Sequence, residues 1–217
     1  MAEGIMGGTF DPIHLGHLSI ASAALEELKL ERVIFLPDGD PPHKRPSCSR
    51  EDRLAMVRLA CADEPRFTVS DMELRRHGRT YTVDTLLALK AQEPSRQLVY
   101  LVGSDTFFLF PTWRTAEKVA RLCRMAIVLR PGDTPEDVRR AQEAFTQTYG
   151  LDSVLLSRPG LDISSSSVRE AIKKGLPVEN LVPAPVDAYM KLHGLYGHAD
   201  QTRAKPSRPD VSNKNHS

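Results

Sequence analysis

The sequence predicts an α/β fold, in which a Rossmann-like, doubly wound parallel sheet has helices on both faces. Short β-rich runs alternate with longer amphipathic segments over the first 160 residues, as in repeated strand–helix units. Two of these runs, at 98–102 (LVYLV) and 125–129 (MAIVL), are apolar throughout, which is typical of strands covered on both faces. The alternation then stops, and a small C-terminal helical subdomain is expected at about 160–197.

Each predicted strand is a short run of β-branched and apolar residues. Strands are expected near Ile5 and at 32–36, 67–69, 98–103, 124–129 and 154–156. Between them Ala, Leu, Glu and Arg recur at helical spacing. That spacing predicts helices at about 17–28, 50–62, 82–92, 115–122 and 135–149, with a short helix after the serine run and a final one at about 186–193. Ser49 and Asp52 have capping-box spacing at the start of the second helix.

The length of 217 residues allows one domain with a sizeable core. We expect that domain to span residues 1–197. Residues 198–217 are dominated by Pro, Ser, Asn, Lys and Arg, so they are predicted to be a disordered tail with no catalytic role.

The charge balance limits the classes of partner. Lys and Arg number 29 against 28 Asp and Glu, which leaves a formal net charge of +1. No global field then attracts nucleic acid or an anionic membrane, so neither is expected as a partner and any phosphate site must be local. Apolar runs of about five residues fall far below the roughly 20 that span a bilayer. The N-terminus lacks the features of a secretory signal, and we expect a cytoplasmic protein.

The chain has three cysteines, an odd number, and no C-x-x-C pair. This pattern disfavours both a disulfide framework and a zinc site. Cys61 and Cys123 lie among apolar residues and are expected to be buried, whereas Cys48 is expected at the surface.

Ligands of doubly wound sheets bind where strands end, so chemistry is expected in the loops 7–17, 37–46 and 103–114. The first loop reads GGTFDPIHLGH, and its two leading glycines allow backbone to approach a ligand closely. His14 and His17 are three residues apart at a helix start, where both rings can face one ligand and the helix N-terminus favours phosphate. The alternative is a tight turn with two surface histidines. A metal site is disfavoured because no third ligand is near in sequence.

A second motif, ISSSSVRE, occupies residues 163–170 and leads into a helix. Its hydroxyls, its backbone N–H groups and Arg169 suit a di- or triphosphate, because Arg offers phosphate oxygens a fixed fork of donors. Ser167 and Glu170 have capping-box spacing, so the alternative is a serine-rich linker with an ordinary helix cap. The chain has neither G-x-G-x-x-G nor a Walker A sequence, which disfavours NAD-dependent redox chemistry and P-loop hydrolysis.

Together the two motifs resemble the nucleotidylyltransferase superfamily, whose signatures are a (T/S)-x-x-H-x-G-H loop and an I-S-S-S/T-x-x-R helix start. The H-x-G-H part of the first signature is matched by His14, Gly16 and His17, with Thr9 five residues before His14, and the second signature by Ile163, Ser164, Ser165, Ser166 and Arg169. Within the superfamily, the chain resembles bacterial nicotinate mononucleotide adenylyltransferases over about residues 3–197. The intervening segments that carry this likeness are Pro41-Pro42-His43-Lys44, Tyr81-Thr82, Gly103-Ser104-Asp105, Pro111-Thr112-Trp113 and Arg130-Pro131-Gly132.

The resemblance implies transfer of AMP from ATP to nicotinate mononucleotide, giving deamido-NAD and pyrophosphate. The catalytic residues are expected to be His14, His17 and Arg169: His17 stabilises the α-phosphate with help from His14, and Arg169 holds the β- and γ-phosphates with Ser164–Ser166. Phosphate beside the two rings is expected to favour their protonated forms. The implied ATP-binding residues are Gly7, Gly8, Thr9, Phe10, Gly16, Gly103, Asp105, Ile163, Ser164, Ser165 and Ser166. The implied nicotinate mononucleotide-binding residues are His43, Lys44, Tyr81, Thr82, Trp113 and Arg130.

Mg²⁺ is expected to arrive with ATP, and no residue is predicted to be a dedicated metal ligand. The oligomeric state stays open, with a homo-oligomer among the options. One departure from the family pattern is Asp38-Gly39-Asp40, where a neutral amide-rich turn is common; two carboxylates there disfavour a direct contact of Asp38 with phosphate.

Other interpretations of the same residues stay open. Pantetheine-phosphate adenylyltransferases share both signature loops, but they are shorter and lack the Pro111-Thr112-Trp113 region and the long C-terminal portion. A nucleotide-binding module without turnover would also keep the loops. Trp113 could pack in the core instead of stacking on a substrate ring, and Phe107, Phe108 and Phe110 are expected mostly to be core residues.

Overall fold

The computed structural model describes residues 2–39, 46–76 and 78–198. Its six strands form one parallel sheet in the order β3-β2-β1-β4-β5-β6. They are β1 (Ala2–Gly8), β2 (Arg32–Pro37), β3 (Phe67–Val69), β4 (Gln97–Gly103), β5 (Arg124–Val128) and β6 (Ser153–Leu155). The predicted α/β fold class is therefore confirmed, and the strand ranges agree to within a residue wherever both ends were predicted.

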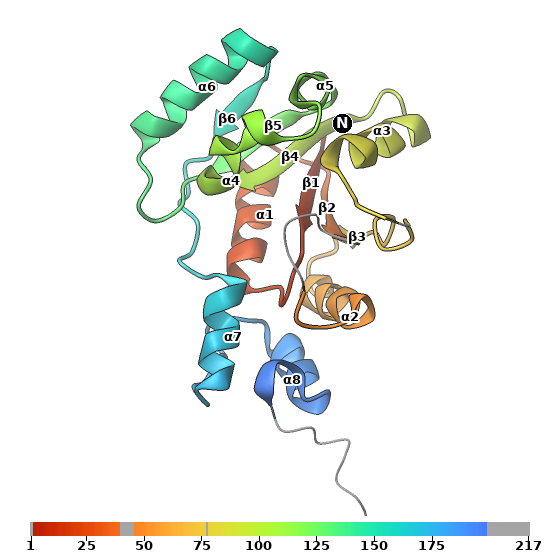
Figure 1. Ribbon diagram of the computed structural model, residues 1–217, viewed down its shortest axis with the longest axis vertical. Coiled ribbons are helices and arrows are strands. Elements are labelled where there is room, and N and C mark those ends of the chain that lie inside the picture. Colours follow the sequence, from red (N-terminus) through yellow and green to blue (C-terminus); the bar gives the residue numbers. More distant parts are fainter. Residues whose placement is uncertain (1, 40–45, 77, 199–217) are drawn as a thin grey trace, which may run out of the picture.

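Helices cover both faces of this sheet (Figure 1). α1 and α2 share one apolar core with α7 and α8, while α3, α5 and α6 share the other with the short α4. The longer helices are α1 (Leu15–Glu27), α2 (Arg50–Cys61), α3 (Thr82–Gln92), α5 (Ala116–Leu122), α6 (Pro135–Tyr149), α7 (Ser165–Lys173) and α8 (Ala184–Leu192). The short ones are α4 (Ser104–Phe108) and the 3₁₀ turns η1 (Phe110–Thr112) and η2 (Leu195–Gly197).

The strands divide their side chains between the two cores because successive residues point to opposite faces. In β2, Val33 and Phe35 join the core beneath α1 and α2, whereas Ile34 and Leu36 join the core beneath α3. Burial on both faces explains why the strands have no polar alternation in the sequence.

The start of α7 differs from the prediction. Ser164 is its N-cap and accepts a hydrogen bond from the Ser167 N–H (3.0 Å), while the Ser167 hydroxyl accepts from the Ser164 N–H (3.0 Å). The predicted pairing of Ser167 with Glu170 is therefore wrong, and Glu170 instead forms an ion pair with Lys174 (2.7 Å). A run of serines offers the same capping chemistry at every position, so spacing alone did not select the first residue of the helix.

Two short helical pieces, α4 and η1, occupy a segment that the sequence analysis leaves as a loop. They bring Phe107 and Phe110 into the core with no exposed surface, as expected, while Phe108 is half-buried. Cys61 and Cys123 are buried, also as expected. Cys48 is half-buried instead of exposed, because its thiol donates to the carboxylate of Asp11 (3.2 Å).

After β6 the chain forms α7, α8 and η2, which lie at the lower end of the molecule in Figure 1. This segment contacts the start of α1, since the Leu15 N–H donates to the Leu181 carbonyl (2.9 Å). The predicted tail lies outside the described residues apart from His198, and the single domain at 1–197 stays a prediction. Within the described ranges, no helix combines the length and apolar character needed to cross a membrane.

Candidate active site

The loop from β1 to α1 places the first motif at the carboxyl edge of the sheet. Phe10 has a left-handed φ of 49°, and its ring is buried against Phe35, so this residue can offer a ligand its backbone but not its ring. A Cβ on Gly16 would lie 2.9 Å from Nδ1 of His14 and 3.4 Å from the Ile163 carbonyl oxygen. Only glycine therefore lets the histidine loop and the start of the serine motif come this close.

The two histidines of the loop form a stacked pair at the start of α1. Their ring centroids are 3.7 Å apart, and the backbone N–H of His14 donates to Nδ1 of His17 (3.2 Å). Because Nδ1 accepts this bond, the neutral His17 ring has its proton on Nε2. The ring can then donate a hydrogen bond from Nε2 to a phosphate oxygen.

His14 is buried, with 2% of its surface exposed, so the alternative of two surface histidines is wrong for this residue. Burial, with a contribution from the charge of Arg130, lowers the pKa of His14 to about 3. His14 is therefore neutral in the protein without ligand, and its protonation beside a bound phosphate stays a prediction. Its Nδ1 is buried without a hydrogen-bond partner among the residues that the structure describes.

The N-terminus of α7 meets the histidine loop. The Ser165 hydroxyl donates to the Pro12 carbonyl (2.9 Å), and Nη1 of Arg169 donates to the Asp11 carbonyl (2.6 Å). Nη2 of Arg169 also reaches the Ser166 hydroxyl (3.3 Å). The structure thus brings together the two motifs, which are about 150 residues apart in sequence.

At the end of β4, Gly103 caps α4 and Asp105 follows in its first turn. Nε of Arg130 lies 3.8 Å from Oδ1 of Asp105, an ion pair whose carboxylate is 59% exposed. The Arg130 N–H also donates to the Ser104 hydroxyl (2.9 Å). Asp105, predicted to bind ATP, and Arg130, predicted to bind the acceptor, are therefore neighbours at the carboxyl edge of the sheet.

The other predicted acceptor residues begin α3 or follow η1. Tyr81 caps α3, directly before Thr82, and the Arg114 guanidinium lies 4.5 Å from the centre of its ring. Trp113 is half-buried, with its ring edge-on to Tyr100 (5.6 Å) and to Phe110 (5.7 Å). The remaining two acceptor residues of the prediction, His43 and Lys44, lie outside the described residues, as does Asp40.

Sequence reasoning missed a buried arginine beneath the site. Arg53 has no exposed surface, and its guanidinium donates to the carbonyls of Thr9 and Asp38, each at 2.8 Å. The Thr9 hydroxyl also donates to the Asp38 carboxylate (3.1 Å). These bonds join the loop after β1 to the loop after β2. The signal was available, because Arg53 shares the apolar face of its helix with Met56 and Val57.

It also missed a buried carboxyl group, Glu73, which is 6% exposed. Glu73 lies in the loop between β3 and α3. The Thr85 hydroxyl donates to its Oε1 (2.6 Å), and this bond joins the loop to α3. Burial raises the pKa of Glu73 to about 7, repulsion from Asp38 adds to the shift, and the threonine donors oppose it. A carboxyl group of this kind titrates near neutral pH, next to the elements that hold Tyr81 and Thr82.

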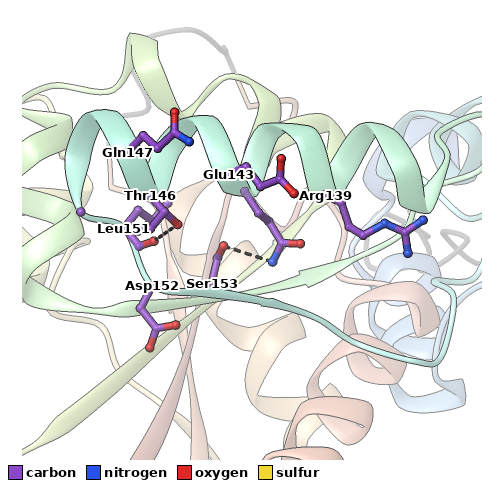
Figure 2. Close-up of a pocket in the computed structure, with 9 residues that line it drawn as sticks. Arg139, Glu143, Thr146, Gln147, Leu151, Asp152 and Ser153 are labelled. Carbon is purple, nitrogen blue, oxygen red and sulfur yellow. Dashed lines mark hydrogen bonds between the residues drawn. The ribbon is translucent and has the colours of Figure 1, made fainter.

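A separate hollow of about 560 Å³ lies between α6 and the edge strand β6 (Figure 2). Its lining includes Arg139, Glu143, Asp152 and Ser153, and Gln142 donates across it to the Ser153 hydroxyl (3.2 Å). No predicted site residue lines this hollow. The candidate site is therefore defined by converging polar groups at the strand ends and not by this groove.

Comparison with known proteins identifies the family of this chain. A family model described as cytidylyltransferase-like matches residues 5–171, a span that includes both motifs. A probable nicotinate-nucleotide adenylyltransferase of Dehalococcoides mccartyi is 45% identical over 201 residues, covering 90% of this chain and 97% of that one. Another of that name, from a Synechococcus strain, is 41% identical over 194 residues, covering 88% and 95%. The chain belongs to the nicotinate-nucleotide adenylyltransferase family.

Solved structures share the fold of this family member. The nicotinic acid mononucleotide adenylyltransferase of Plasmodium falciparum, complexed with NaAD, matches with a TM-score of 0.75 at 18% identity, covering 91% of this chain and 98% of that one. A putative nicotinate-nucleotide adenylyltransferase of Vibrio parahaemolyticus matches with a TM-score of 0.62 at 18% identity, covering 92% and 98%. The predicted superfamily and family are thus confirmed for this chain.

Proposed function

We propose that the protein transfers AMP from ATP to nicotinate mononucleotide, forming deamido-NAD and pyrophosphate in the synthesis of NAD. The observation that carries the proposal is the convergence of the stacked His14 and His17 with the N-terminus of α7. This arrangement supplies ring, hydroxyl, guanidinium and backbone donors at one edge, as a triphosphate needs. The relatives in Dehalococcoides and Synechococcus, through their printed names, support the choice of acceptor.

The reaction is an in-line attack by a phosphate oxygen of the acceptor on the α-phosphorus of ATP. A bond forms between that oxygen and phosphorus as the bond to the β-phosphate bridging oxygen breaks, and pyrophosphate leaves with the electron pair. The attacking oxygen is already anionic, so no general base is required. Catalysis then consists of positioning two polyanions and stabilising the charge that moves to the leaving group.

His17 donates from Nε2 to an oxygen of the α-phosphate, in the tautomer that the His14 N–H imposes on it. His14 contributes its buried Nδ1, which has no protein partner in the described part of the chain. The β- and γ-phosphates are held by Ser164–Ser166, the first N–H groups of α7 and Arg169. An arginine has five N–H donors, so donors remain after the bonds to the Asp11 carbonyl and to Ser166.

The remaining ATP contacts are assigned to the loop backbone and to the end of β4. Gly7, Gly8, Thr9, Phe10 and Gly16 allow the phosphates to approach the loop between β1 and α1. Gly103 and Asp105 take the adenosine end, and Ile163 precedes the α7 cap.

The acceptor is placed against Tyr81, Thr82 and Trp113, with His43, Lys44 and Arg130 as candidates for its phosphate. Two edge-on aromatic neighbours, Tyr100 and Phe110, hold the indole of Trp113. A pyridinium ring stacked on that indole gains both π contact and cation–π attraction.

Mg²⁺ is treated as part of the ATP substrate, where it neutralises phosphate charge. Within the described ranges, no group of three or more His, Cys, Asp or Glu side chains is arranged to hold a metal ion. The groups assigned to the phosphates are nitrogen and hydroxyl donors, which suit phosphate oxygens better than they suit Mg²⁺. We further propose that these small molecules, and not nucleic acid or membrane, are the ligands of a cytoplasmic protein.

The test is pyrophosphate release from Mg²⁺-ATP with nicotinate mononucleotide, nicotinamide mononucleotide or phosphopantetheine in parallel. Fastest release with the nicotinate form supports the proposal. A preference for the nicotinamide form keeps the mechanism and contradicts the acceptor, and a preference for phosphopantetheine contradicts the assigned pocket. ATP binding without release for any acceptor would instead indicate a nucleotide-binding module.

A further inference from the structure

The carboxylate of Asp11 joins three segments that are distant in sequence. Its side chain is 7% exposed. The Tyr196 hydroxyl donates to Oδ1 (2.7 Å), the Cys48 thiol donates to Oδ1 (3.2 Å), and the Ser47 N–H donates to Oδ2 (2.7 Å). Burial alone would raise the pKa of Asp11, but these donors and Arg169 outweigh it and lower the pKa. Asp11 is therefore an ionised residue whose position is set by its donors.

Asp11 in turn sets the position of Arg169. Nη1 of Arg169 donates to the Asp11 carbonyl (2.6 Å) and lies 3.9 Å from Oδ2 of the same residue. A displacement of Asp11 would consequently move the guanidinium that is assigned to the phosphates.

Tyr196 comes from η2, at the end of the described chain, and its backbone is strained. Its φ is 60°, in the left-handed region that a tyrosine rarely adopts. Such a conformation persists only where the surrounding contacts determine it. The hydroxyl supplies those contacts, since it lies 2.7 Å from Oδ1 of Asp11 and 3.0 Å from the sulfur of Cys48.

We propose that Tyr196 is a positioning residue for ATP binding: its hydroxyl fixes Asp11, and Asp11 fixes the guanidinium of Arg169. The inference rests on the proposed function, because it takes Arg169 as a ligand of the ATP phosphates. It assigns to the C-terminal turn η2 a role in the site at the opposite end of the sequence.

The first experiment measures the dissociation constant of ATP by calorimetry for the wild type, Tyr196→Phe and Tyr189→Phe. Tyr189 is the matched control, because its hydroxyl donates to the carboxylate of Asp52 (2.9 Å) and not to Asp11. Loss of one hydrogen bond, at about 1 kcal/mol, predicts about fivefold weaker ATP binding for Tyr196→Phe. Tyr189→Phe is expected to bind ATP as the wild type does. Equal affinities for the two variants would overturn the proposal.

The second experiment tests whether the effect passes through Arg169. In an Arg169→Lys background, Tyr196→Phe is expected to cause less than about a twofold further loss of ATP affinity, since the fork held by Asp11 is gone. A full fivefold loss in that background would show that Tyr196 acts elsewhere and would overturn the proposal.

The third measurement is the reactivity of the Cys48 thiol toward a disulfide reagent. Cys61 and Cys123 are buried, so the fastest-reacting thiol is Cys48. Burial raises the pKa of the Cys48 thiol, and the Tyr196 hydroxyl, which lies 3.0 Å from the sulfur, acts to lower it, so Tyr196→Phe is expected to slow the reaction several-fold. Unchanged thiol reactivity in Tyr196→Phe would show that the hydroxyl does not contact Cys48 and Asp11 in solution, and would overturn the proposal.

ATP affinity and thiol reactivity need no turnover. If the wild type released no pyrophosphate with nicotinate mononucleotide, the proposed function would fail, while both measurements would still test Tyr196.

Discussion

Replacing Glu73 with Gln should change how the stability of the protein depends on pH. Glu73 is 6% exposed, and its pKa is raised from 4.5 to about 7, chiefly by burial. Between these two values the folded state keeps a proton that the unfolded chain releases. The free energy of unfolding must therefore fall as pH rises through this window and level off above it.

The size of the effect follows from the two pKa values. Each pKa unit corresponds to about 1.4 kcal/mol. Integrated from pH 5 to pH 8, a shift from 4.5 to about 7 removes about 2.5 kcal/mol of stability from the wild type. Glu73→Gln keeps an acceptor for the Thr85 hydroxyl but cannot ionise, so this loss should be absent from the variant.

The assay is urea unfolding of the wild type and Glu73→Gln at pH 5, 6, 7 and 8. All other titrating groups, His14 among them, are common to both proteins, so the difference between the two isolates Glu73. Glu143→Gln, on the exposed surface of α6, is the control and should follow the wild type. A wild-type-to-variant difference that stays constant from pH 5 to pH 8 would refute the reasoning.

Three further predictions concern the site. His17→Ala should lower kcat by roughly 10², as loss of a preorganised donor does, and an unchanged kcat in pyrophosphate release would contradict its role. Trp113→Ala should weaken acceptor binding by about 1–3 kcal/mol, visible as a higher acceptor KM with the ATP KM kept, and an unchanged acceptor KM would remove Trp113 from the pocket. Gly16→Ala places a methyl group 2.9 Å from Nδ1 of His14, so thermal unfolding should show a loss of about 1–3 kcal/mol together with reduced turnover. Wild-type stability in this variant would mean that the loop relaxes freely.

The sequence predicted the sheet well because its signal is local. Apolar runs such as 98–102 can be buried on both faces only in a covered parallel sheet, and the strand ends followed directly from them. The segment 104–112 was harder, since its short helical pieces depend on packing of Phe107 and Phe110 against residues far along the chain. The helical structure of this segment is therefore determined by tertiary packing and not by local helix propensity.

The candidate site was predicted in part. Both motifs were found from residue types and spacing, and the structure brings them together through Ser165 and Arg169. The neutral state of His14 was not predictable, because it depends on burial by the surrounding fold. The role of Asp11 was missed for a similar reason: its donors Ser47 and Tyr196 are 36 and 185 residues away, and no local pattern marks such partners.

The buried guanidinium of Arg53 has a consequence for any attempt to change the acceptor specificity of the protein. It donates to a carbonyl on the loop after β1, at Thr9, and to one on the loop after β2, at Asp38. A new acceptor specificity built by reshaping the loop after β2 would therefore be transmitted to the ATP loop through one rigid side chain. Under the proposed assignment of the two loops, ATP and acceptor specificity are coupled through Arg53, and mutations that alter one preference while sparing the other are expected beyond Asp38, among residues that Arg53 does not contact.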